Sequence, residues 1–356
     1  MPLFVALLVM VLVSSTSSTF VQSLFRGRPL HLLRDDLFSI GAGLRISGNK
    51  ARKFRGLNVS SCDAIVSYGG AQSNSMAALS TLAHENNRRF VYYTTSLPLF
   101  LKTSTAQESN FATAVSNGME LVEIRSDEYA YLAAAPKHNR GFPDHALPLP
   151  AGIKSSENLC WVPQGGACPE AESGCIALAA QVAEYITAME QRQQQERQGA
   201  QRRRWLLAMA SGTGTTALFT SRSLQTLHPD VPCSVVAVPC AGSGADLLQQ
   251  MEVLDRASGG AGRCPDLLEG ENTSSSSRSP RVFAKPNSEH LLLWKDLCSQ
   301  LCVPFDLVYT PRAFEQLLES AAWMDQSQTE IIYYCCGGAE GNLSQLARYK
   351  RAGLHV

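Results

Sequence analysis

Residues 67–74 read Ser-Tyr-Gly-Gly-Ala-Gln-Ser-Asn and separate two segments with different periodicities. The residues before the glycines, 63–68 (DAIVSY), form a short apolar run typical of a buried strand. The residues after them place Met76 and Leu79 on one face of a helix, with Ser73 as its N-cap. A strand that turns through glycines into a helix is the repeating unit of parallel α/β folds. Hydroxyl and amide groups at such a helix N-terminus suit a bound carboxylate, and they suit an ordinary N-capped helix equally well.

The same alternation continues along most of the chain, which predicts an α/β fold with a mostly parallel sheet. We expect strands at residues 63–68, 90–95, 121–124, 205–210, 234–240 and 331–336. Further helices are expected at residues 111–115 and 174–188. The polar residues 190–204 are expected to be a solvated helix end or a loop. Residues 140–153 have the composition of a connection, and residues 257–287 that of a flexible surface insertion.

The composition excludes several classes of protein. The chain has 356 residues, of which 45% are apolar and 17% are charged, so a large core can form and global disorder is excluded. Lysine plus arginine and aspartate plus glutamate each number 31, so the formal net charge is zero. This balance argues against nucleic-acid partners and against attachment to anionic membranes. A small-molecule enzyme and a binding protein remain.

The cysteines and the N-terminus bear on the cellular compartment. The 11 cysteines are odd in number and lack the spacing of a zinc site, so we expect reduced, mostly buried thiols and no metal. Residues 3–13 are an unbroken apolar run, too short for a stable membrane span, and residues 14–19 are only Ser and Thr. Residues 1–19 therefore fit an export signal or another kind of extension. Because the cysteines argue against secretion, the compartment, cytoplasmic or organellar, stays open.

Two more segments have the residue types of an anion site. Residues 47–53 read Ser-Gly-Asn-Lys-Ala-Arg-Lys, with three cations in four positions, although alone this run fits a solvated basic helix start better. Residues 211–217 (SGTGTTA) follow a predicted strand directly, and their N–H and O–H groups can cup a phosphate. They also match a loose dinucleotide fingerprint, which needs an acidic residue at the end of the next strand. That strand ends in Val238-Pro239-Cys240, so a phosphate cup fits better than a nicotinamide dinucleotide site.

Two turns near the C-terminus complete the pattern. Tyr309-Thr310-Pro311 and residues 335–342 (CCGGAEGN) each look like the end of a strand that opens onto a helix. Taken alone, both fit ordinary turn chemistry.

Together and in this order, these segments resemble the family of pyridoxal-phosphate (PLP) enzymes that contains D-cysteine desulfhydrase and 1-aminocyclopropane-1-carboxylate (ACC) deaminase. The motifs that carry the resemblance are R-D-D at 34–36, S-G-N-K-A-R-K at 47–53, G-G-x-Q-S-N at 69–74 and G-G-x-x-G-N at 337–342. The resemblance extends from about residue 21 to residue 349.

The resemblance implies fold type II, the tryptophan-synthase-β-like fold. This fold has two three-layer α/β domains with mostly parallel sheets, and PLP lies in the cleft between them. The implied small domain is residues 62–160. The implied large domain is residues 20–61 and 161–356. Related enzymes are dimers, so the resemblance also implies a homodimer.

The resemblance implies roles for individual residues. Lys50 matches the lysine that forms the Schiff base with PLP, and Lys53 matches a lysine that contacts its phosphate. Asn74 matches the amide that bonds the phenolic oxygen of PLP. Ser73 matches a serine at the substrate, as a carboxylate contact or as a nucleophile or base, and Tyr309 matches a tyrosine near the substrate. The other implied residues are the phosphate cup Ser211, Gly212, Thr213, Gly214 and Thr215, the pyridine-nitrogen partner Thr310, and the substrate contacts Gly70, Gln72, Asn74 and Cys336.

Two positions bear on the substrate. ACC deaminases carry Glu where this chain has Thr310, whereas desulfhydrase-like members carry Thr. A neutral partner leaves the ring a weaker electron sink, which suits elimination of a good leaving group. Cys336 matches neither branch, and Cys335 stands where His is usual.

The predicted reaction is therefore PLP-dependent α,β-elimination on a small amino acid, with D-cysteine giving pyruvate, sulfide and ammonia. ACC deamination and PLP binding without turnover remain alternatives. We expect Asp35 and Asp36 to hold the region of Arg52 structurally rather than to transfer protons.

Overall fold

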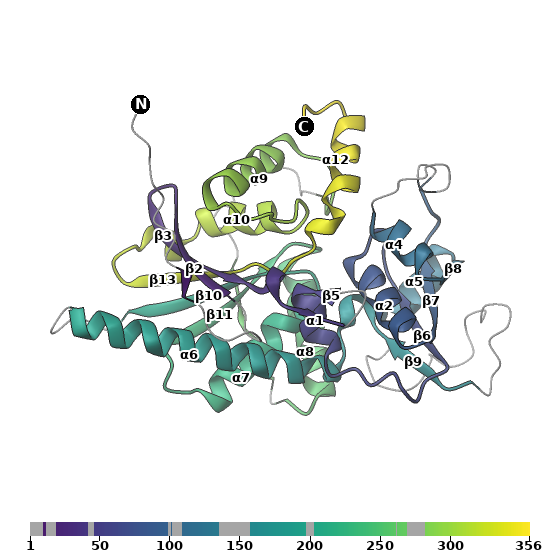
Figure 1. Cartoon of the computed structure of the whole chain (residues 1–356), viewed down its shortest axis with the longest axis horizontal. Coiled ribbons are helices and arrows are strands. Elements are labelled where there is room, and N and C mark those ends of the chain that lie inside the picture. Colours follow the sequence, from purple (N-terminus) through teal and green to yellow (C-terminus); the bar gives the residue numbers. More distant parts are fainter. Residues whose placement is uncertain are drawn as a thin grey trace.

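The computed structural model describes residues 10–11, 19–41, 46–98, 101, 109–134, 157–196, 203–260, 262–268 and 282–356. Most of the predicted N-terminal extension, the predicted connection at 140–153 and residues 269–281 of the predicted insertion lie outside this set. Within it, no helix is both long enough and apolar enough to cross a membrane. The described chain forms two main sheets, each covered by helices (Figure 1).

The larger sheet has the strand order β1-β2-β3-β13-β10-β11-β12. Its strands are β1 Met10–Val11, β2 Thr19–Phe25, β3 Arg28–Arg34, β10 Arg204–Ser211, β11 Cys233–Pro239, β12 Asp266–Leu267 and β13 Thr329–Tyr334. The five strands from β3 to β12 are parallel, and β2 is antiparallel to both of its neighbours. Arg26 and Gly27 close the β2–β3 hairpin with φ values of 49° and 77°, a turn whose twist matches that of paired strands.

Helices cover both faces of this sheet, because successive side chains of its strands point to opposite sides. In β10, Leu207 and Met209 join the core beneath α6 Glu172–Glu196, α7 Thr215–Leu227 and α8 Gly244–Ala257. Leu206 and Ala208 join the opposite core, against α9 Ser288–Leu301, α10 Thr310–Leu318 and α11 Ala321–Met324. Figure 1 shows α6, α7 and α8 on one side of the sheet, and α9 and α10 with α12 Asn342–Arg351 on the other.

The smaller sheet is wholly parallel, in the order β8-β7-β6-β9. Its strands are β6 Ala64–Tyr68, β7 Arg89–Thr94, β8 Met119–Glu123 and β9 Leu159–Val162. Residues of α1 Gly48–Phe54, α2 Asn74–Glu85 and α4 Asn110–Ser116 pack on one face, and α5 Ser126–Ala134 packs on the other. A short ribbon of β4 Ser39–Ile40 and β5 Ile46–Ser47 leads into α1, which lies between the two sheets (Figure 1).

The observed architecture is the predicted fold class, with two three-layer α/β units. Each of the six strands predicted by residue range is present to within two residues of its predicted bounds, and the polar residues 190–196 continue α6 as a helix end. The predicted insertion at 257–287 needs a correction, because Asp266–Leu267 pairs with β11 as the edge strand β12. The division into domains at residues 62 and 160 stays a prediction.

Candidate active site

Loops at the carboxyl ends of β3, β10 and β13 meet at one edge of the larger sheet, where α/β folds bind ligands. The turn after β13 is tied to α1, because the N–H of Asn49 donates to the carbonyl oxygen of Cys336 at 3.0 Å. Gly48 has φ +63°, and a Cβ there would collide with the same carbonyl oxygen. Only glycine fits this close approach, which brings Lys50 next to the Cys336 turn.

Lys50 is a partly buried amine on α1. Burial lowers its pKa, and the neighbouring thiol of Cys336 opposes this shift. Burial in turn raises the pKa of Cys336, so this side chain is a neutral thiol at neutral pH rather than a reactive thiolate. An amine with a lowered pKa is more often in the neutral form that attacks a carbonyl carbon.

The Gly-rich loop after β10 leads into the N-terminus of α7 as expected. Gly214 is the N-cap, with φ +68°, and gives the helix no side-chain cap. The uncapped N–H groups of the first turn, together with the helix dipole, suit an anion. The hydroxyls of Thr213 and Thr215 lie 2.9 Å apart at this turn. Ser211 points elsewhere, because its hydroxyl donates to the carbonyl oxygen of Met209 at 2.9 Å.

Lys53 on α1 is linked to the same loop through the turn that follows β9. Its Nζ donates to the carbonyl oxygen of Gly165 at 3.0 Å, in the turn that follows β9. A Cβ at Gly165 would lie 2.9 Å from Cγ2 of Thr213, so this turn touches the loop after β10. Burial and the charge of Lys50 lower the pKa of Lys53 to about 7. An anion beside Lys53 would favour its charged form.

Ser73 and Asn74 lie at the start of α2. The Oγ of Ser73 accepts from the N–H groups of Ser75 at 3.1 Å and Met76 at 3.3 Å, so Ser73 is the predicted N-cap. The Oδ1 of Asn74 accepts from Nδ2 of Asn110 at 2.5 Å. The Nδ2 of Asn74 lies against Gly338, where a Cβ would collide with it. The second glycine pair and the start of α2 are therefore in contact.

Two other predicted residues belong to the same loop. The carbonyl oxygen of Gly70 accepts from the Tyr92 hydroxyl at 3.2 Å and from the N–H of Ser73 at 3.0 Å. Both polar side-chain atoms of Gln72 are buried and have no hydrogen-bond partner among the described residues. A buried amide of this kind needs a partner, which a ligand can supply.

Tyr309 and Thr310 begin α10, and here one expectation is wrong. No strand precedes them, because residues 302–309 are irregular. Side chains instead satisfy this backbone: the carbonyl oxygen of Phe305 accepts from Trp294 Nε1 and Asn342 Nδ2, both at 2.8 Å. A Cβ at Gly212 would lie 3.3 Å from the hydroxyl of Tyr309, which places the ring over the loop after β10. Burial raises the pKa of Tyr309.

The expectation for the acidic pair is half right. Asp35 binds Arg52 at 2.7 Å, as expected. Asp36 instead pairs with Arg34, also at 2.7 Å.

Three residues of the site were not found from the sequence. Asn110 holds Asn74, and Tyr92 holds Gly70. Asp306 accepts a hydrogen bond from Thr310 at 2.6 Å. Asp306 alone had a local signal, since Asp is favoured just before a helix. Asn110 and Tyr92 come from separate elements and act through long-range contacts.

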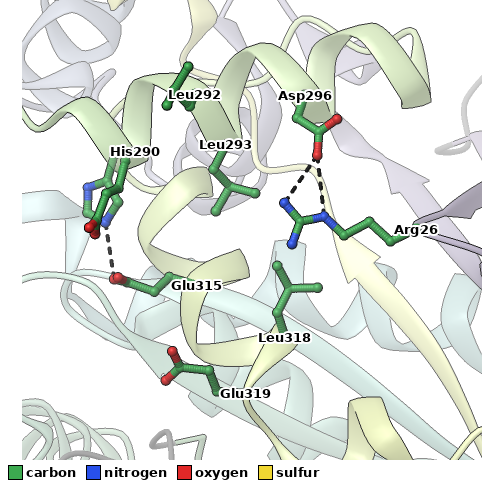
Figure 2. A pocket seen from close by; sticks show the side chains of 9 residues that line it. Arg26, His290, Leu292, Leu293, Asp296, Glu315, Leu318 and Glu319 are labelled. Atoms are coloured by element: carbon green, nitrogen blue, oxygen red, sulfur yellow. Dashed lines mark hydrogen bonds and ion pairs between the residues drawn. The ribbon is translucent and has the colours of Figure 1, made fainter. Parts of the chain in front are cut away.

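A cavity near α9 and α10 is lined by none of these residues. It has a volume of about 570 Å³ and lies against α9 and α10 (Figure 2). In its lining, Arg26 pairs with Asp296 at 3.2 Å, and His290 contacts Glu315 at 3.1 Å. We therefore assign it no role in the chemistry.

Comparison with known proteins identifies the fold. No protein-family model matches the sequence, and no curated protein matches it. An ACC deaminase homologue of known structure superposes with a TM-score of 0.62 at 17% identity, covering 90% of this chain and 89% of that chain. An L-serine ammonia-lyase from Rhizomucor miehei gives 0.54 at 12% identity, covering 97% and 99%. A pyridoxal 5'-phosphate-dependent aspartate racemase gives 0.50 at 10% identity, covering 90% of each chain. The chain therefore has the fold of the fold type II PLP-dependent enzymes.

Proposed function

We propose that this protein binds PLP and catalyses α,β-elimination on a small amino acid. The observation that carries the proposal is the placement of the partly buried Lys50 amine on the same helix as Lys53, whose ammonium lies beside the Gly-rich loop. An aldehyde needs an amine, and a phosphate needs N–H donors and a cation. One short helix and one loop supply both kinds of group.

The residues present fit the cofactor. The first turn of α7 has no side-chain cap, and the buried hydroxyl of Thr216 in that turn has no partner among the described residues. The phosphate would be held there by the loop of residues 211–215 and by Lys53. Lys50 would hold the aldehyde carbon, and the Nδ2 of Asn74 would donate to the phenolic oxygen. Bound PLP supplies the electron sink that makes removal of the α-proton feasible.

The protein's own groups have separate tasks. The Oγ of Ser73 already accepts two N–H groups, and its hydroxyl also hydrogen-bonds the side chain of Tyr92, so Ser73 is poorly placed to act as a base. This favours the carboxylate-contact role over that of a base, with the N-terminus of α2 and Gln72 beside it. The amine of Lys50, when it is not bonded to the aldehyde, would be the group that takes the α-proton. Tyr309, neutral because its pKa is raised, can donate a proton but is a poor base at neutral pH.

For the substrate we propose D-cysteine, with pyruvate, sulfide and ammonia as products. Support comes from Thr310, the residue of desulfhydrase-like members at this position. ACC is the second candidate, because the buried carboxylate of Asp306 accepts a hydrogen bond from Thr310 and adds a charge next to it. The homodimer also stays a proposal.

The test is titration of the purified holoenzyme with D-cysteine, L-cysteine, D-serine and ACC, followed by its absorption spectrum. Specificity constants are then compared for pyruvate from D-cysteine and 2-oxobutyrate from ACC in one preparation. A higher value for D-cysteine supports the proposal, and a clear preference for ACC overturns the substrate assignment. A cofactor band without either product would leave a PLP-binding protein.

A further inference from the structure

Thr310 is held from behind by a buried carboxylate. Its hydroxyl donates to Oδ2 of Asp306 at 2.6 Å, and its own N–H lies 3.3 Å from the same oxygen. The hydroxyl of Tyr333 lies 3.3 Å from Oγ1 of Thr310 and donates to it. Thr310 has only one hydroxyl proton, and this geometry commits that proton to Asp306.

The hydrogen-bond donors around Asp306 favour its ionised form and oppose the effect of burial. Its Oδ1 accepts from the N–H groups of Val308 at 3.0 Å and Tyr309 at 2.5 Å, so both carboxyl oxygens receive main-chain donors. Burial is the larger effect and raises the pKa of Asp306 overall, while these hydrogen bonds act in the opposite direction. Donors that cannot reverse their direction stabilise a carboxylate over a carboxylic acid.

The ionisable side chains around Asp306 are uncharged at neutral pH, so none of them forms an ion pair with it. The side chains that interact with it electrostatically are Cys240, Cys298, Tyr309, Tyr333 and Cys336. The pKa of each is raised by burial, so all five are neutral at neutral pH. The hydroxyl of Thr310 is therefore the side-chain donor available to this carboxylate among the hydrogen bonds of the described residues.

Because the hydroxyl of Thr310 donates its proton to Asp306, its oxygen can only accept a hydrogen bond from a group on the cofactor side. We propose that Asp306 is a positioning residue that, through Thr310, keeps the ring nitrogen of bound PLP protonated. This rests on the proposed function, in which Thr310 meets that nitrogen. An oxygen with only a lone pair to offer is matched by N–H and mismatched by a bare nitrogen.

The inference changes what Thr310 means for the reaction. Considered alone, a threonine leaves the ring neutral and a weak electron sink. Through its hydrogen bond to Asp306, Thr310 stabilises the protonated ring nitrogen, although less than a carboxylate in direct contact with that nitrogen would. The electron sink is then strong enough for leaving groups poorer than sulfide. Thr310 therefore favours D-cysteine over ACC less strongly than the identity of residue 310 alone implies.

The test is nitrogen NMR of the holoenzyme loaded with PLP that carries ¹⁵N in the ring. It is run at mildly alkaline pH, where a pyridine nitrogen without a partner is unprotonated. The wild type is expected to show the shift of a protonated nitrogen. Asp306→Asn should show the unprotonated shift, because the new amide donates to Thr310 and turns the hydroxyl proton toward the ring. Tyr333→Phe is the matched control, since it removes the other partner of Thr310 and leaves the carboxylate, and it should keep the wild-type shift.

The outcomes separate this inference from the proposed function. Absence of a PLP absorbance band, or of borohydride trapping on Lys50, in the wild type would overturn the proposed function and with it this inference. If PLP is linked to Lys50 but the wild-type nitrogen is unprotonated, only the inference fails. It also fails if Asp306→Asn keeps the protonated shift. If Asp306→Asn does not fold, Thr310→Val interrupts the same link, and a protonated nitrogen in that variant would overturn the inference.

Discussion

The guanidinium of Arg52 donates to the carboxylate of Asp35 at 2.7 Å, with side-chain exposures of only 1% and 0%. The hydroxyl of Tyr334, the last residue of β13, donates to the other oxygen of Asp35 at 2.5 Å. Arg52 lies two residues after Lys50 on α1, and Asp35 directly follows β3. The pair therefore fixes the helix that carries Lys50 to the edge of the larger sheet.

We expect Asp35→Asn to lower the free energy of unfolding by about 3–5 kcal/mol, because it leaves the buried guanidinium without its counter-charge. Urea unfolding of the apoprotein measures this. Asp127→Asn removes the partner of Arg125 from an exposed pair and should leave the unfolding midpoint unchanged. Equal midpoints for Asp35→Asn and the wild type would show that the buried pair does not hold α1.

The contact between Asp35 and Arg52 also illustrates which parts of the structure could be predicted from the sequence and which could not. The strands and helices were predictable because apolar periodicity records which residues a sheet buries on each face. The loops were predictable because glycines mark close approaches, as at Gly48, where the backbone of another loop leaves no room for a Cβ. The sequence did not predict which of the two aspartates, Asp35 or Asp36, pairs with Arg52. Adjacent aspartates point in different directions, and only the fold decides between them.

The residues that support the site could not be predicted in the same way. Asn110 is 36 positions from Asn74 and becomes its partner only when α4 packs beside α2. The irregular segment before Tyr309 looked like a strand because Val303, Phe305 and Leu307 are apolar. The backbone of this segment forms hydrogen bonds with side chains of α9 and α12 and with Asp306. The periodicity of apolar residues cannot predict such contacts.

Lys50→Ala is expected to abolish the absorbance band of the protein-linked cofactor and all turnover. The reason is that no other group is proposed to bond the aldehyde. Absorption spectra and borohydride trapping of the reconstituted variant measure this. Lys295→Ala, which removes an exposed amine on α9, should retain both signals. Wild-type elimination by Lys50→Ala would disprove the assignment of this lysine.

Gly214→Ala is expected to weaken PLP binding by about tenfold or more, equivalent to about 1.4 kcal/mol. Position 214 has φ +68°, and a Cβ there would lie 2.5 Å from the sulfur of Met251, so either this side chain or the first turn of α7 must shift. Gly118→Ala controls for backbone strain, because Gly118 has φ +84° with no atom within 4 Å of an added Cβ. Each should lose about 1–2 kcal/mol of stability from strain. Titration of both apoproteins with PLP should show a loss of affinity only in Gly214→Ala.

Lys53 predicts a pH dependence of apoprotein stability. Its pKa is about 7 in the folded chain, against about 10.4 for an unfolded lysine, so between these values the unfolded state binds more protons. Folding stability contributed by Lys53 therefore rises from pH 7 upward, by at most about 1.4 kcal/mol per pH unit. Lys53→Met keeps the length of the side chain and removes the titration. Unfolding curves at several pH values above 7 should rise more steeply in the wild type than in Lys53→Met, and parallel curves would contradict the lowered pKa.

Asn110 and Asn117 provide a matched pair for testing the position of Asn74. Both join α4 to α2 through their Nδ2 atoms: Asn110 to Asn74 Oδ1 at 2.5 Å, and Asn117 to the hydroxyls of Ser80 and Thr81, each at 3.1 Å. Each alanine variant should lose about 1–3 kcal/mol of stability, since it leaves polar partners unsatisfied.

Only Asn110→Ala should also weaken PLP binding, by about tenfold, equivalent to about 1.4 kcal/mol. Without Asn110, the Asn74 amide is free to rotate and its Nδ2 no longer points steadily toward Gly338 and the proposed phenolic oxygen of PLP. Urea unfolding and PLP titration of the two variants separate the effects. Equal PLP affinities in Asn110→Ala and Asn117→Ala, with comparable stabilities, would mean that Asn110 supports the packing of α4 on α2 and has no part in orienting Asn74.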